Sequence, residues 1–175
     1  LIPSLVQGKQ DIIISDELNH GSIIDGVRLT KAQRAVFPHN DMGAFEQVLK
    51  ENQDAERKLV IVDGVFSMDG DICPLDELTE LAEEYNAMVM VDDCHGEGVL
   101  GDGGRGIVDH FKLQGRVDFE VGSFSKALGV QGGILAGKEI VRKHALNHSR
   151  SWLLSGSQPP GVAAAQKAAV EVLMD

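Results

Sequence analysis

A lysine, an aspartate and a histidine near the middle of the chain could together carry out carbonyl chemistry. Lys126 lies in a run of small residues, Gly-Ser-Phe-Ser-Lys-Ala-Leu-Gly, that follows an apolar segment. Asp92 ends another strongly apolar segment, and His95 follows it closely. A lysine amine can condense with a carbonyl group, and a carboxylate can keep a bound pyridine ring protonated. These residues predict a site for pyridoxal 5'-phosphate (PLP), with Lys126 as the Schiff-base lysine.

Each of these residues also has an ordinary structural explanation. Asp92 could cap a helix or a turn, but an apolar strand that ends in two acids favours a functional role. Its neighbour Asp93 is expected to point to the opposite face of the sheet. A single histidine such as His95 is more often structural, although the nearby acid favours function. Lys126 could be a solvated side chain, and Ser123 could be a turn serine rather than a phosphate ligand.

The pattern around these residues predicts an α/β fold with a mostly parallel sheet flanked by helices, because short apolar runs alternate with longer segments of helical period. Strands are expected at residues 11–15, 34–37, 58–63, 87–92, 118–122 and 133–136. Helices are expected at residues 22–29, 42–50, 75–85, 138–149 and 161–174, with Asp41 capping the second. Asp63, Asp92 and Lys126 then lie at or just after strand carboxyl ends, where open α/β sheets bind ligands.

Composition excludes several classes of partner. The chain of 175 residues is 43% hydrophobic and 25% charged, which predicts one domain with a sizeable core. Its formal net charge of -11 argues against nucleic acid and anionic membrane surfaces. Its 2 cysteines match neither a disulfide framework nor a zinc site, so no metal is expected. No apolar run is long enough to span a membrane, and we expect a cytoplasmic protein.

Two glycine-rich motifs resemble nucleotide-binding loops. Residues 96–101 match G-x-G-x-x-G, but the glycine-rich residues that follow predict a loop where a dinucleotide site requires a helix. Residues 132–138 match the P-loop pattern, but Glu139 stands where a magnesium-binding hydroxyl is needed. We interpret this second motif as an apolar strand.

Four sequence runs, in order along nearly the whole chain, resemble the α-oxoamine synthases. They are SDELNHGSIIDG from Ser15, DGVFSMDGD from Asp63, VDDCHG from Val91 and SFSKALG from Ser123. The resemblance implies the aspartate aminotransferase fold (fold type I) and the cofactor PLP. It also implies that residues 1–175 are part of the large, cofactor-binding domain, with an N-terminal segment and a C-terminal small domain lying outside them.

The resemblance assigns ring contacts to four residues. His20 matches the histidine that stacks on the PLP ring, which the residues alone would suggest only as a helix-capping neighbour of Ser22. Asp92 matches the partner of the pyridine nitrogen, and His95 the partner of the phenolic oxygen. Lys126 matches the Schiff-base lysine. Lys126 and His95 are the expected catalytic residues, His95 as a hydrogen-bond donor to a developing oxyanion.

Hydroxyl groups complete the implied cofactor site. Ser67 matches a serine near the cofactor, and Ser123 stands where the family usually has a phosphate-binding threonine. Residues 154–160 resemble a segment that reaches the phosphate of a neighbouring subunit, so a homodimer is expected. Gly156 departs from the threonine or asparagine that is common there, which weakens that contact.

The expected substrates are an amino acid and an acyl-coenzyme A. Residues 18–20 and 23–29 look closer to glycine C-acetyltransferase, which favours glycine and acetyl-coenzyme A and a 2-amino-3-oxo acid as product. One alternative is 8-amino-7-oxononanoate synthase, a decarboxylating enzyme of the biotin pathway. Another is an aminotransferase, aldolase or lyase of the same fold. A different class of alternative is an inactive fragment that serves as a binding or assembly module.

Overall fold

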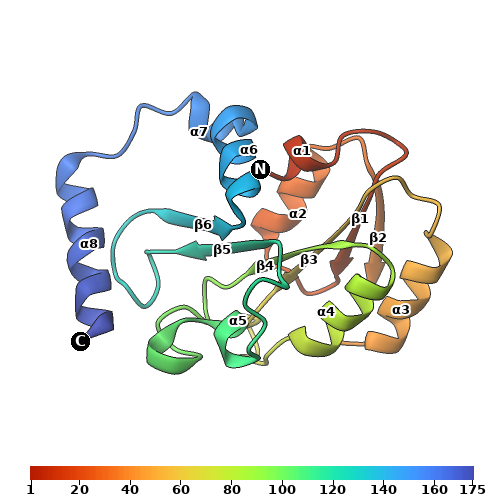
Figure 1. The fold of residues 1–175 in the computed structure, drawn as a ribbon, viewed down its shortest axis with the longest axis horizontal. Helices are drawn as coiled ribbons and strands as arrows, with labels where there is room; N and C mark the ends of the chain where they lie inside the picture. The colour runs from red at the N-terminus through yellow and green to blue at the C-terminus, as the bar shows by residue number, and fades with distance from the viewer.

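The computed structural model describes residues 1–175 and is built on one six-stranded sheet (Figure 1). The strand order is β2-β1-β3-β4-β5-β6; the first five strands in this order pair in parallel, and β6 is antiparallel to β5. The strands are β1 (Ile12–Asp16), β2 (Gln33–Phe37), β3 (Lys58–Asp63), β4 (Met88–Asp92), β5 (Phe119–Ser123) and β6 (Gly133–Gly137). The predicted α/β fold with a mostly parallel sheet is confirmed.

Helices cover both faces of the sheet, as the crossovers between parallel strands require (Figure 1). One face is covered by α1 (Ile2–Leu5), α2 (Gly21–Arg28) and α6 (Glu139–His148). The other is covered by α3 (Met42–Glu51), α4 (Leu75–Glu84) and α5 (Ile107–His110). The remaining helices are the 3₁₀ turn η1 (Asp102–Gly104), α7 (Arg150–Leu153) and α8 (Pro160–Met174).

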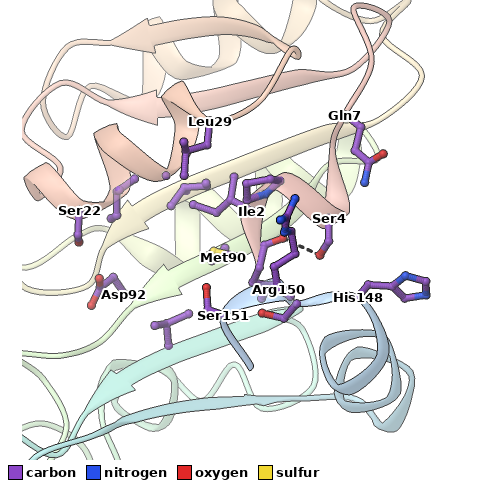
Figure 2. A pocket seen from close by; sticks show the side chains of 17 residues that line it. Ile2, Ser4, Gln7, Ser22, Leu29, Met90, Asp92, His148, Arg150 and Ser151 are labelled. Carbon is purple, nitrogen blue, oxygen red and sulfur yellow. Dashed lines mark hydrogen bonds between the residues drawn. The ribbon is translucent and has the colours of Figure 1, made fainter. Parts of the chain in front are cut away.

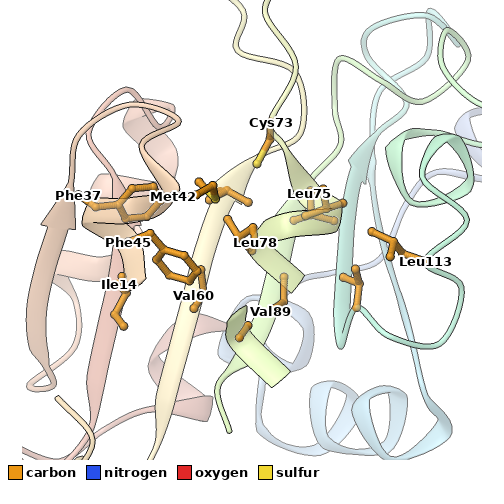
Figure 3. Packing of buried hydrophobic residues seen from close by; sticks show 14 of the residues in the cluster. Ile14, Phe37, Met42, Phe45, Val60, Cys73, Leu75, Leu78, Val89 and Leu113 are labelled. Atoms are coloured by element: carbon orange, nitrogen blue, oxygen red, sulfur yellow. The ribbon is translucent and has the colours of Figure 1, made fainter. Parts of the chain in front are cut away.

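Two apolar clusters fill the space between the sheet and these helices. Successive residues of a strand point to opposite faces, so Val60 and Val62 of β3 join one cluster while Leu59 and Ile61 join the other. Figure 3 shows part of the larger cluster, where Phe37 and Phe45 lie with ring centroids 5.0 Å apart. This burial on both faces is the main stabilising contribution to the sheet that carries the site.

All predicted strands and long helices are present, with ends within one residue of the expected positions. Asp41 caps α3 as predicted, because its carboxylate accepts a hydrogen bond from Ala44 N at 2.9 Å. The elements that the pattern did not predict are α1, η1, α5 and α7, each shorter than five residues. None of the helices combines the length and apolar character needed to cross a bilayer.

Candidate cofactor site

All six residues predicted to form the cofactor site line one cavity of about 200 Å³. The cavity lies at the carboxyl ends of neighbouring parallel strands, the edge at which open α/β sheets bind ligands. Four further residues complete its lining. The predicted residues are His20, Ser67, Asp92, His95, Ser123 and Lys126, and the others are Ser22, Asp63, Val65 and Cys94.

His20 is both the N-cap of α2 and part of the cavity wall. Its Nδ1 accepts a hydrogen bond from Ser22 N at 3.2 Å and lies 2.8 Å from Ser22 Oγ. Its backbone N donates to Asp63 Oδ2 at 2.8 Å. His20 therefore caps α2 and lines the cavity at the same time, because the capping hydrogen bond holds its ring at the start of the helix.

Asp63 is a cavity residue that sequence reasoning noted only as the end of a strand. Its backbone N donates to Asn19 Oδ1 at 2.9 Å, and Asn19 Nδ2 donates to Ile61 O at 2.7 Å and to Ser15 Oγ at 2.8 Å. This buried amide joins the ends of β1 and β3. Burial, followed by the negative charge of Asp92, raises the pKa of Asp63 to about 6. The sequence feature that could have assigned Asp63 to the site was its position as an acid at the end of an otherwise apolar strand.

Asp92 lies at the end of β4, half-buried, and its Oδ1 accepts a hydrogen bond from Cys94 N at 3.1 Å. The turn that follows brings Cys94 and His95 into the cavity wall. Burial and a hydrogen bond to Asp92 raise the pKa of Cys94 to about 12. The thiol therefore remains protonated at neutral pH and does not supply a nucleophile here.

Ser123 and Lys126 follow from the end of β5. Ser123 Oγ lies 2.6 Å from Ser125 Oγ and accepts from Ser125 N at 3.1 Å, which places two hydroxyl groups side by side. Ser123 N donates to Glu97 Oε2 at 3.0 Å. Lys126 is exposed in the turn that follows, so its amine is accessible from the cavity.

Asp93 points away from the cavity, as the alternation of strand residues predicts. Its Oδ2 accepts a hydrogen bond from Ile107 N at 2.8 Å, on the face covered by α5. Burial raises the pKa of Asp93 to about 7. This side chain supports the loop after β4 and has no access to the cofactor site.

A larger cavity of about 720 Å³ lies between α1, α2 and the segment that joins α6 to α7 (Figure 2). Figure 2 shows Met90 on its sheet side and Arg150 and Ser151 across from it. Of the six predicted residues only Asp92 lines this cavity, so it lacks Lys126, His20 and His95. The smaller cavity is therefore the candidate site despite its size.

Neither glycine-rich motif forms a nucleotide-binding loop. Residues 96–101 lead into a 3₁₀ turn, and no long helix starts there. An isolated antiparallel β-bridge between the backbones of Glu97 and Arg105 closes this loop. The second motif contains β6, whose residues Gly133–Gly137 pair with β5. Both motifs are loop or strand, as predicted.

The profile of the family Aminotransferase class I and II matches residues 1–173. The chain belongs to this family. Among its curated members, the 8-amino-7-oxononanoate synthase of Fervidobacterium nodosum is 58% identical over 177 residues, which cover 99% of this chain and 45% of that protein. Within the aminotransferase family the chain is therefore grouped with the α-oxoamine synthases, as its sequence runs implied. It spans less than half the length of the curated relatives that it matches.

Solved members of the family share this architecture. A serine palmitoyltransferase from S. paucimobilis with bound PLP and myriocin matches with a TM-score of 0.94 and 34% identity, covering 99% of this chain and 45% of that one. The 8-amino-7-oxononanoate synthase of Francisella tularensis matches with a TM-score of 0.83 and 26% identity, covering 99% and 50%. These matches confirm that the chain has the fold predicted for it, that of the large domain of a fold type I PLP enzyme.

These curated relatives, at 57–58% identity, are named 8-amino-7-oxononanoate synthases, which favours that alternative over glycine C-acetyltransferase. The acetyltransferase was favoured by residues 18–20 and 23–29. The structure shows that Ile23 and Val27 of this stretch are core residues of α2, which pack beneath the sheet. Similarity at these two positions therefore reflects how the helix packs.

The residues around the small cavity match what PLP requires of a protein. PLP needs an amine for its carbonyl carbon, an acid for its ring nitrogen, a surface against its ring and donors for its phosphate. Lys126 and Asp92 would supply the first two, and His20 would offer its ring as the surface. The hydroxyl groups of Ser123 and Ser125 lie next to each other, and Ser123 lines the cavity together with Lys126. The donor set therefore fits the family's cofactor.

Proposed function

We propose that this chain forms part of a PLP-dependent 8-amino-7-oxononanoate synthase. The observation that carries the proposal is the single cavity in which Lys126, Asp92, His95 and His20 meet. The relatives named for this activity support the choice within the family. The other members of the site, Ser67 and Ser123, are proposed as cofactor-binding residues.

The structure of the product indicates the substrates. An α-oxoamine synthase joins the Cα of an amino acid to the acyl carbon of a thioester. In 8-amino-7-oxononanoate, the carbon that bears the amine also bears a methyl group, which is the Cα of alanine after loss of its carboxylate. Carbons 1–7 then come from a seven-carbon dicarboxylic acid attached to coenzyme A. We therefore propose alanine and a heptanedioic acid thioester in place of glycine and acetyl-coenzyme A.

The reaction balances with these substrates. The Cα–H bond of alanine breaks, a bond forms between Cα and the acyl carbon, and the bond from that carbon to sulfur breaks. The proton taken from Cα balances the one that coenzyme A carries away as a free thiol. The bond from Cα to the carboxylate breaks to release carbon dioxide, and a proton takes its place. PLP, when bound, supplies the electron sink that makes these changes at Cα possible.

The chain's own residues hold and move protons around these bonds. Asp92 keeps a proton on the ring nitrogen, and Lys126 binds the cofactor's carbonyl carbon and supplies an amine that exchanges the proton on Cα. His95 donates a hydrogen bond to the acyl oxygen, where negative charge develops as the new bond forms. His20 covers one face of the ring and orients it, because the cap at Ser22 fixes its imidazole.

A substrate comparison tests this proposal. Full-length protein loaded with PLP is given alanine or glycine, with the heptanedioic or the acetyl thioester, and release of free coenzyme A thiol is measured. Alanine with the heptanedioic thioester is expected to give a kcat/KM at least about 100-fold above glycine with acetyl-coenzyme A, since each added methylene contributes to binding. Faster turnover of glycine with acetyl-coenzyme A would reverse the assignment.

The segment between α7 and α8 bears on the expected homodimer. Residues 154–160 are the exposed connection between α7 and α8 together with the first residue of α8, and none of them lines the cavity. This placement leaves the segment accessible to a second subunit. We propose a homodimer in which this connection approaches the partner's site, and residues 1–175 as part of the large domain.

A further inference from the structure

The segment after β3 folds into a short hairpin that carries Ser67 to the cavity. Val65 and Ile72 form an antiparallel bridge at its base, and Phe66 N donates to Asp71 O at 3.0 Å. Gly70 N donates to Phe66 O at 2.8 Å, which closes the tip. We call residues 64–73 the Ser67 hairpin. Its tip is exposed, so contacts at its base must hold Ser67 in place.

His39 joins this hairpin to the end of β1. Its Nδ1 lies 3.0 Å from Asp16 Oδ1, and its Nε2 is hydrogen-bonded to Asp71 Oδ2. The Asp16 side chain is 1% exposed and that of His39 is 21% exposed, so the contact is largely shielded from water. The edge of the imidazole packs on the ring of Phe66, with centroids 4.3 Å apart.

Asn40 strengthens the same connection. Its backbone N donates to Asp16 Oδ2 at 2.9 Å, and its Nδ2 donates to Asp71 Oδ2 at 3.0 Å. Its φ of 53° turns the chain so that both donors reach their acceptors. The two carboxylates thus share neighbouring donors from residues 39 and 40, and the hairpin has a second attachment independent of the imidazole.

The two carboxylate contacts of His39 favour a doubly protonated ring. Nε2 also lies 3.2 Å from Asn40 Nδ2, but its contact with Asp71 requires a proton on this nitrogen. A carboxylate can only accept hydrogen bonds, so both ring nitrogens must carry protons to donate to Asp16 and Asp71 at once. The charged groups that face His39 are carboxylates: Asp16 and Asp71 at the ring, and Glu17, which accepts from His39 N at 3.0 Å. Burial opposes the charge, but the hydrogen bonds to these acids outweigh it and raise the pKa of His39. A neutral imidazole would lose one of the two bonds.

We infer that His39 is a positioning residue: as an imidazolium it clamps the Ser67 hairpin to the end of β1 and so holds Ser67 in the cofactor cavity. The link to PLP rests on the proposed function, whereas the link between His39 and the hairpin rests on the contacts alone. The clamp opens as pH rises, because the deprotonated ring can donate to only one carboxylate.

Amide hydrogen exchange in full-length, cofactor-free protein tests the clamp directly. In His39→Gln, the protection factors of the Phe66 and Gly70 amides are expected to fall at least about tenfold, with the β3 and β4 amides unchanged. Wild-type hairpin protection is expected to fall as pH rises through the raised pKa of His39, whereas that of His39→Gln stays level. Asp71→Asn should behave like His39→Gln. Asp69→Asn is the matched control, because Asp69 is an exposed acid of the same hairpin.

PLP affinity, followed by cofactor fluorescence, tests whether the clamp acts through Ser67. Ser67→Ala and His39→Gln are each expected to weaken PLP binding, and the double variant is expected to be no weaker than the poorer single variant. Unchanged hairpin protection in His39→Gln, or fully additive losses of affinity, would overturn the inference. A wild-type protein that binds no PLP would overturn the proposed function, while the exchange data would still decide whether the clamp exists.

Discussion

Asp63 and Asp92 occupy the same register position on the neighbouring parallel strands β3 and β4, so two carboxyl groups face the cavity from adjacent strand ends. Burial raises the pKa of Asp63 to about 6, and the charge of Asp92 adds to the effect. The pair places one acid against the proposed ring nitrogen and keeps the other proton-bound under mildly acidic conditions.

The raised pKa of Asp63 predicts a pH-dependent stability that Asp63→Asn removes. Between about pH 4 and pH 6 the folded protein binds this proton and the unfolded chain does not, so the free energy of unfolding falls as pH rises. The loss amounts to at most about 3 kcal/mol and is complete above the folded pKa. Asparagine cannot titrate, but its side-chain oxygen can still accept from His20 N.

Urea denaturation of wild type and Asp63→Asn at pH 4 and pH 7 measures this effect. The variant is expected to gain about 2–3 kcal/mol relative to wild type over that range. The pKa of Asp93 is also raised, but Asp93 is present in both proteins, so its contribution cancels in the difference between their free energies of unfolding. Exposed Asp69→Asn is the control and should show no such gain. A constant difference between wild type and Asp63→Asn would contradict the assignment.

Replacing Lys126 by alanine is expected to remove the visible absorbance of lysine-bound PLP and the release of coenzyme A. The reason is that no other lysine lines the cavity. Lys138→Ala is the matched control, because Lys138 belongs to the P-loop-like motif and precedes α6. Absorbance spectra of full-length protein with PLP would check both variants, and an unaltered band in Lys126→Ala would exclude this lysine.

His20 variants separate its capping role from its cofactor role. Asparagine is a favoured N-cap, so His20→Asn should keep α2 stable to within about 0.5 kcal/mol, whereas His20→Ala should cost about 1 kcal/mol. Both variants lack the imidazole ring and are expected to lose PLP affinity to a similar extent. Thermal unfolding and PLP titration measure the two effects. Normal affinity in His20→Asn would show that the ring does not contact the cofactor.

The loop after β4 depends on close packing around Asp93. Gly106 has a φ of +89°, and a Cβ there would overlap Asp93 Oδ2, which accepts the hydrogen bond from Ile107 N. Gly115 has a similar φ of +83° but open space around it. Gly115→Ala should therefore cost only the backbone strain, about 1–2 kcal/mol.

Gly106→Ala should cost at least that strain, because its ψ of -174° lies outside the left-handed helical region, and in addition about 1–3 kcal/mol for displacing Asp93. Urea denaturation of the two variants measures the difference. Equal losses would indicate that the carboxyl group moves aside freely, and that close packing at Gly106 contributes little to the loop.

The periodicity of the sequence was sufficient to predict every strand and long helix, because parallel strands buried on both faces read as unbroken apolar runs. Residues 58–63 are an example, and all six are buried. Short elements such as α5 were missed, since four residues contain barely one helical turn and no detectable period. The motif runs also led to six cavity residues, because the acid, the lysine and the imidazoles occur at strand ends.

What the linear pattern could not show is which distant groups share a hydrogen bond or a charge. The bond from His20 N to Asp63, the pairing of Asp63 with Asp92 and the bridge from Asp16 through His39 to Asp71 join different strands and loops. These contacts depend on strand order and register, which arise from packing of the whole sheet. Chemistry could be inferred from residue types along the chain, whereas ionisation and positioning follow from the neighbours that the folded sheet provides.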